Sequence, residues 1–154
     1  MCFWKNLAKF VGMKQSIDFL PERKQRDLHE LVGLIRNEVE DVVMIILYGS
    51  YARNTYVELD IRRDYGGGKI QYMSDYDILV VSKKRLGSRT VTVSSRVKSS
   101  FLKNKNANTQ TRPSIINESI TKFNNALSEG RYFYVDILTE GIVLYDSGEC
   151  QLAT

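Results

Sequence analysis

The first third of the chain alternates between helix-like and strand-like hydrophobic patterns. Between Pro21 and about Glu40, apolar residues recur at the spacing of one helix face, which predicts a helix with the stripe Leu28, Leu31, Val32, Ile35 and Val39. Val42 to Tyr48 is an unbroken β-branched and apolar run, typical of a buried strand. Gly49-Ser50 interrupts that run, and a short helix is expected from Tyr51 to about Thr55.

The middle of the chain predicts a hairpin and a second buried strand. Val57 to Met73 holds two extended stretches around a Gly66-Gly67-Gly68 tip, as in a β-hairpin. Asp75 to Val81 then predicts a central strand. The segment from Ser88 to Lys105 is ambiguous. Val93, Val97 and Phe101 fit a helix, whereas Thr90 to Val93 alternates like a strand; we favour the helix.

The last third predicts further strands and helices around the same core. Arg112 to Ile116 fits a third strand, and Asn117 fits the cap of a helix that ends at Gly130, with the apolar face Ile116, Ile120, Phe123 and Leu127. Phe133 to Glu140 predicts a second short helix or turn, and Ile142 to Tyr145 a last strand. The expected fold is α/β (α+β): a small mixed sheet flanked by helices.

Composition narrows the class of protein. The 154 residues suit one domain, and 43% hydrophobic with 26% charged residues is ordinary for a soluble globular chain. The longest apolar run is far too short to cross a bilayer, so no membrane role is expected. Cys2, Cys150 and the single His29 cannot form a disulfide framework or a zinc cluster. His29 is expected on or near the helix surface. With only two cysteines, we expect a reduced, cytoplasmic setting.

The chain ends suggest a domain flanked by short extensions. We expect an N-terminal extension over residues 1–20, a main domain over 21–146 and a tail over 147–154. Met1 to Gly12 lacks the sustained apolar core and cleavage site of a secretory signal, and Met13 is an alternative natural start. The tail is expected to lead to a helical domain absent from this sequence or encoded separately.

Charge is distributed unevenly. The net charge is +4, yet no Asp or Glu occurs between Ile78 and Asn117. This stretch, the basic block, contributes nine cations: Lys83, Lys84, Arg85, Arg89, Arg96, Lys98, Lys103, Lys105 and Arg112. It is typical either of a surface beside a polyphosphate or nucleic acid, or of a solvated helix face. RNA binding is therefore one hypothesis, although only Phe101 interleaves the block.

Two short motifs carry candidate chemistry. Gly49-Ser50 lies at a strand-to-helix turn, where a glycine permits close backbone approach and free N–H groups suit a phosphate. In Ser74-Asp75-Tyr76-Asp77, strand alternation puts both carboxylates on one face and Tyr76 on the other. Neighbouring carboxylates suit Mg²⁺ or Mn²⁺, whose remaining ligands include substrate phosphates. Together the motifs favour phosphoryl or nucleotidyl transfer.

These motifs resemble those of a known superfamily. GSYARN at residues 49–54 and SDYDILV at 74–80 are similar to the pattern G-S-x-A-R-G and S-D-x-D-[LI] of polymerase-beta-type nucleotidyltransferases, in particular the minimal branch found beside helical HEPN domains. The resemblance extends from the helix after Pro21 to the strand at Ile142. It implies the polymerase-beta-like nucleotidyltransferase fold, and proteins of this branch act as antitoxins or regulators.

The resemblance also implies roles. Gly49 and Ser50 would bind the nucleotide phosphates, and Asp75 and Asp77 would hold Mg²⁺ or Mn²⁺. Arg53 would either support the loop or contact a phosphate. The reaction would transfer a nucleoside monophosphate from ATP or another NTP to a hydroxyl, such as a tyrosine of a HEPN partner.

This sequence departs from the family pattern in three places. Asn54 replaces a glycine, which asparagine's tolerance of positive φ accommodates. The spacer before Asp75 is long, and the third strand at Arg112 to Ile116 lacks the family's third carboxylate. Asp136 is our candidate for that acid, with Glu118 also near the strand. Without a third acid, the alternative is a catalytically weak module that binds nucleotide and partner.

Overall fold

Four strands form one mixed sheet in the computed structural model, which describes residues 13–63 and 65–149. The strands are β1 (Val42–Tyr48), β4 (Tyr76–Ser82), β5 (Pro113–Ser119) and β6 (Ile142–Asp146), in the spatial order β5-β4-β1-β6. β1 is antiparallel to both β4 and β6, whereas β4 and β5 are parallel. The two apolar runs of the sequence thus form the centre of the sheet.

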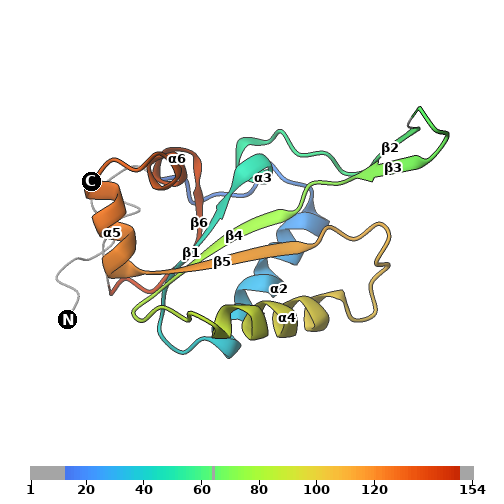
Figure 1. Cartoon of the computed structure of the whole chain (residues 1–154). Coiled ribbons are helices and arrows are strands. Elements are labelled where there is room, and N and C mark those ends of the chain that lie inside the picture. The colour runs from blue at the N-terminus through green and yellow to red at the C-terminus, as the bar shows by residue number, and fades with distance from the viewer. Residues whose placement is uncertain (1–12, 64, 150–154) are drawn as a thin grey trace.

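Helices cover both faces of this sheet (Figure 1). On one face, Ile45, Leu47, Ile78 and Val80 share a core cluster with the buried stripes of α2 (Glu22–Glu38) and α4 (Arg89–Leu102). On the other face, Met44, Ile46, Leu79 and Val81 pack with α5 (Ile120–Ser128) and α6 (Tyr132–Glu140). Burial on both faces explains why β1 and β4 are continuously apolar. The predicted fold class, a small mixed sheet flanked by helices, is confirmed.

The glycine-tipped hairpin forms as predicted but does not join the main sheet. β2 (Asp60–Arg63) and β3 (Lys69–Tyr72) pair only with each other among the described residues and project away from the body of the molecule (Figure 1). Tyr65 and Tyr72 are exposed on this ribbon. The hairpin is therefore an appendage inserted between the two sequence motifs.

The helix after β1 differs from its predicted bounds. α3 (Gly49–Arg53) starts at the glycine itself and ends before Asn54, whereas the sequence predicted Tyr51 to Thr55. Asn54 has φ +59° and its N–H bonds to the carbonyls of Ser50 and Tyr51. The left-handed residue ends the helix, as asparagine can do at such positions.

The prediction that Asn117 caps a helix is wrong. Asn117 lies within β5, which continues to Ser119, and the Ser119 hydroxyl caps α5 by accepting from the Lys122 N–H. The Asn117 side chain instead accepts from the Leu86 N–H at 2.8 Å and donates to the Val80 carbonyl at 2.9 Å. Asparagine and serine both favour helix caps, so tertiary hydrogen bonds decide which of Asn117 and Ser119 caps α5.

Two further segments are helical. The ambiguous stretch after Ser88 forms α4, the helix that we favoured, and the predicted short helix or turn after Phe133 forms α6. His29 is exposed, as expected for a position on or near the helix surface. Of the expected N-terminal extension, residues 1–12 lie outside the described residues, and residues 13–20 contribute Met13, Ile17 and Leu20 to the two core clusters. In the part of the chain that the structure describes, no helix has the length and apolarity needed to traverse a bilayer.

Replacing Asn117 with alanine tests its tertiary role. The buried Leu86 N–H loses its acceptor, so we expect the free energy of unfolding in urea to fall by about 1–3 kcal/mol. Asn125→Ala, at an exposed position of α5, is the matched control and should change it by less than about 0.5 kcal/mol. A loss no larger than the control's would contradict this role.

Candidate active site

The glycine turn lies directly against one of the two acids. Tyr48, the last residue of β1, is opposite Asp77 of β4 in the antiparallel register. The chain then turns at Gly49 with φ +73°. A Cβ atom at Gly49 would lie 2.3 Å from Asp77 Oδ2 and 3.2 Å from its Cγ. A side chain at Gly49 would therefore be strained by the backbone conformation and would require the Asp77 carboxylate to move.

The two carboxylates lie close enough to interact electrostatically, although Asp75 precedes β4 and Asp77 is its second residue. Asp75 is exposed and Asp77 half-buried, while Tyr76 between them is fully buried with the α2 and α4 side of the core. Burial raises the pKa of the Asp77 carboxyl, the negative charge of Asp75 raises it further, and the Arg53 guanidinium opposes both. The site thus concentrates negative charge on a partly desolvated carboxylate.

Arg53 links the turn helix to the other side of the site. Its Nη1 lies 3.4 Å from Glu140 Oε2, at the end of α6. Its charge also acts on Asp77. The contact with Glu140 is compatible with support of the loop, one of the two roles that the sequence left open, and both roles stay predictions. Ser50, half-buried, is the second residue of α3, and its carbonyl accepts from the Thr55 N–H at 2.8 Å.

Tyr48 is a neighbour of Asp77 that sequence reasoning missed. Burial and the Asp77 charge raise the pKa of its hydroxyl to about 12, so it remains protonated at neutral pH. Its ring packs edge-on against Phe133 at 5.7 Å between centroids. A tyrosine that ends an apolar strand gives no sequence signal for this position.

Among the described residues, no third acid joins Asp75 and Asp77 in a metal-binding group. Asp136 is exposed on α6, and the described residues contain no group of three or more Asp, Glu, His or Cys side chains that could hold a metal ion. Glu118 lies opposite Val81 near the far end of β4, where its buried carboxylate accepts from the Ser119 N–H at 3.1 Å. Ser114 is the residue of β5 opposite Asp77. Neither candidate acid therefore gains support, and a serine occupies the neighbouring strand position.

Asp75 and Asp77 nevertheless fit part of a divalent-metal site. Carboxylate oxygens are the ligands that Mg²⁺ and Mn²⁺ prefer, and a cation would relieve the repulsion that raises the pKa of Asp77. The missing side chain at Gly49 keeps Asp77 Oδ2 free of steric overlap. These two acids would hold such an ion, with further ligands from water and substrate.

A buried lysine behind the site was also missed. Lys24 of α2 is 2% exposed. Its ammonium donates to the hydroxyl of Tyr51, in the first motif, and lies near the ring of Tyr76, between the two acids of the second motif. A sequence signal existed, because Lys24 falls four residues before Leu28 and seven before Leu31 on the predicted apolar stripe. A cation at such a position indicates either snorkelling or a buried network.

Two clefts include residues of the two motifs. One, of about 240 Å³, includes Asp75 and lies between the base of the hairpin, at Tyr72 and Met73, and the loop that contains Asn108 and Arg112. The other, of about 520 Å³, includes Arg53. The sheet order puts β4, which carries Asp77, between β5 on one side and β1 on the other. The first of these clefts includes one of the two acids, and the second includes neither.

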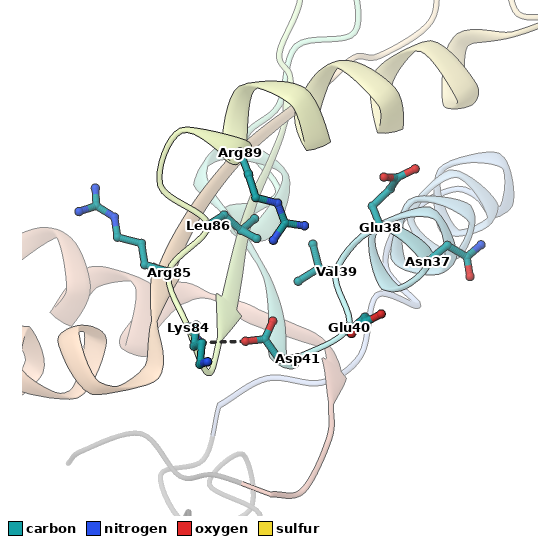
Figure 2. A pocket seen from close by; sticks show the side chains of 9 residues that line it. All are labelled: Asn37, Glu38, Val39, Glu40, Asp41, Lys84, Arg85, Leu86 and Arg89. Atoms are coloured by element: carbon teal, nitrogen blue, oxygen red, sulfur yellow. Dashed lines mark hydrogen bonds between the residues drawn. The ribbon is translucent and has the colours of Figure 1, made fainter.

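A third pocket, of about 510 Å³, lies away from this chemistry (Figure 2). It adjoins the start of β1 and the end of β4, opposite the end that carries Asp77, and the Lys84 N–H donates to Asp41 Oδ2 across it. Arg89 points into it, whereas Arg85 turns away (Figure 2).

Four of the nine cations of the basic block form ion pairs with acids elsewhere in the chain. The pairs lie within 4.0 Å and comprise Lys83–Glu149, Arg85–Glu118, Arg96–Glu38 and Lys105–Glu30. These pairs are at least partly solvated, which favours the interpretation as a charged surface. RNA binding by the block stays a prediction.

Comparisons with known proteins give little further information. No family model matches the chain, and no curated protein matches it. Among solved structures, a candidate nucleotidyltransferase from Sulfolobus solfataricus is similar over 85% of this chain and 90% of its own, with 15% identity and a TM-score of 0.44. At this level, the similarity assigns neither an activity nor a site residue to this chain.

The pKa of Asp77 predicts a pH-dependent stability change. Because its folded pKa is raised, the folded state holds the proton more tightly, so this residue lowers stability as pH rises through that pKa. Without divalent metal, Asp77→Asn should therefore raise the Tm at pH 7 relative to the wild type, and by less at pH 3.5. Asp75→Asn should also raise the Tm at pH 7, because it removes the repelling charge.

Thermal denaturation in EDTA at the two pH values measures both variants. A lower Tm for Asp77→Asn at pH 7, or a difference that does not vary with pH, would contradict the electrostatic description of the pair.

Proposed function

We propose that this chain is a nucleotidyltransferase that moves a nucleoside monophosphate, most simply AMP from ATP, to a hydroxyl acceptor. The observation that carries the proposal is the close approach of the Gly49 backbone to the Asp77 carboxylate, where a Cβ atom would overlap Oδ2; it supports one site for the turn and the carboxylate pair. Neither motif alone has this meaning, because turns and acidic strand ends are common in other proteins.

Each residue of the site has a proposed role. Asp75 and Asp77 hold Mg²⁺ or Mn²⁺, which supplies positive charge to the phosphates when bound. The backbone at Gly49 and Ser50 accommodates a phosphate, and Arg53 holds the turn through Glu140. The acceptor oxygen forms a bond to the α-phosphorus, the bond from that phosphorus to the β-bridging oxygen breaks, and pyrophosphate leaves. The hydroxyl proton passes to solvent or to a nearby carboxylate.

Ser114 beside Asp77 supports a second candidate function. With serine rather than an acid at this register position, deprotonation of the acceptor lacks a dedicated third carboxylate. The chain would then act as a catalytically weak module that binds nucleotide and regulates a HEPN partner. In either case the proposed partner is a helical HEPN protein or domain, whose tyrosine is the proposed acceptor, as the sequence resemblance implies.

Incubation with ATP labelled at the α-phosphate, Mg²⁺ and a HEPN partner tests the activity. We expect label on the partner with α-labelled but not γ-labelled ATP. Asp77→Asn should lower the rate by at least about 100-fold, because charge stabilisation at the transferring phosphate is lost.

Asp136→Asn is the matched control and tests the sequence candidate for the third acid. Since Asp136 joins no metal-binding group in the described residues, we expect this variant to retain activity. Binding of ATP without transfer would leave the regulatory module, and the absence of ATP binding by folded wild type would contradict both functions.

A further inference from the structure

Lys24 connects segments that are far apart in the sequence. Its ammonium is buried under the sheet and donates to Tyr51 Oη at 2.8 Å and to Thr111 Oγ1 at 3.3 Å. Glu58 Oε1 lies at 3.6 Å, and Arg23 also contacts Glu58. The cation therefore has hydrogen-bonding partners and a counter-charge, which a buried ammonium requires.

Three aromatic rings surround the same ammonium. Lys24 Nζ lies 5.0, 5.4 and 5.8 Å from the ring centroids of Tyr51, Tyr56 and Tyr76. Tyr51 stacks on Tyr56 at 4.2 Å, and its centroid lies 4.6 Å from that of Tyr76. Cation–π attraction is strongest where the cation is desolvated, as here.

α2 holds the second motif through a neighbouring residue as well. Tyr76 Oη donates to Asp27 Oδ2 at 2.7 Å, and Gln110 Nε2 donates to the same oxygen at 2.9 Å. Burial, the largest cause, raises the pKa of the Tyr76 hydroxyl, so this group stays a donor. α2 thus contacts both motifs from the face opposite the acids.

We propose that Lys24 is a positioning residue: by fixing Tyr51 of the turn helix and Tyr76 of the acid strand to one ammonium, it sets the approach of Gly49 to Asp77. This inference rests on the proposed function, because positioning matters only if the turn and the acids act together. Tyr51 is two residues from Gly49, and Tyr76 adjoins Asp77. Small shifts of either backbone therefore reach the reacting groups.

An apolar side chain of the same length at position 24 would fill the space but would not fix the two tyrosines. A methionine makes no directional contact, whereas the ammonium binds two hydroxyls in fixed directions and lies within 5.8 Å of three ring centroids. Misplacement by about 1 Å is enough to reduce a rate roughly 100-fold.

Lys24→Met tests the proposal, with Lys98→Met as the matched control at an exposed position of α4. In the proposed transfer assay we expect kcat to fall about 10- to 100-fold for Lys24→Met, more than KM rises, and to stay unchanged for the control. Amide hydrogen exchange gives a readout that needs no activity. Exchange of the Tyr76 N–H, which bonds to the Arg112 carbonyl, should accelerate more than exchange of the β1 core amides.

A second pair of variants covers the case in which Lys24→Met does not fold. Thr111→Val removes the hydroxyl that accepts from Lys24 while keeping the shape, and Thr111→Ser keeps the hydroxyl. We expect the valine variant to reproduce the local exchange effect and the serine variant not to.

The outcomes separate the two hypotheses. Equal acceleration at all amides, or none at Tyr76, in Lys24→Met or Thr111→Val would overturn the positioning role even if the enzyme is active. If the wild type transfers no label but the local exchange effect appears, the proposed function fails and the structural coupling between Lys24 and the two motifs stands.

Discussion

The close approach of the glycine turn to Asp77 is the constraint on which the candidate site depends. The β1–β4 register puts Tyr48 opposite Asp77, so the chain that leaves β1 must pass directly over this carboxylate. A side chain at Gly49 would overlap Asp77 Oδ2, and its φ of +73° disfavours other residues as well. The sheet register therefore defines where the glycine turn meets Asp77.

The two faces of the sheet carry different parts of this region, the acid on one and the tyrosine contacts on the other. Asp77 faces the side of the sheet covered by α5 and α6, whereas Tyr76 faces α2. On α2, Asp27 accepts from the Tyr76 hydroxyl and Lys24 donates to Tyr51. The acid pair is unfavourable in itself, since burial and mutual repulsion raise the pKa of Asp77. A network of satisfied hydrogen bonds on the opposite face keeps this arrangement in place; no buried side-chain polar atom among the described residues lacks a partner.

Periodicity was enough to predict most elements, because the apolar stripes and runs directly reflect burial on one or both faces. Glycines and alternation also located the hairpin and put both acids on one face. Sequence could not decide between Asn117 and Ser119 as a cap, because tertiary hydrogen bonds made that choice. Sequence also could not find Ser114 beside Asp77, because this neighbourhood depends on the parallel register. Nor could it find the contacts of Lys24 with Tyr51 and Thr111, which lie 27 and 87 positions further along the chain.

A crystal structure with Mg²⁺ and a non-hydrolysable ATP analogue tests the central claim most directly. We predict the metal on the carboxylates of Asp75 and Asp77 and the triphosphate against the backbone of Gly49 and Ser50. A nucleotide bound elsewhere, for example in the pocket beside Arg89, or a metal that contacts neither acid, would contradict the shared site.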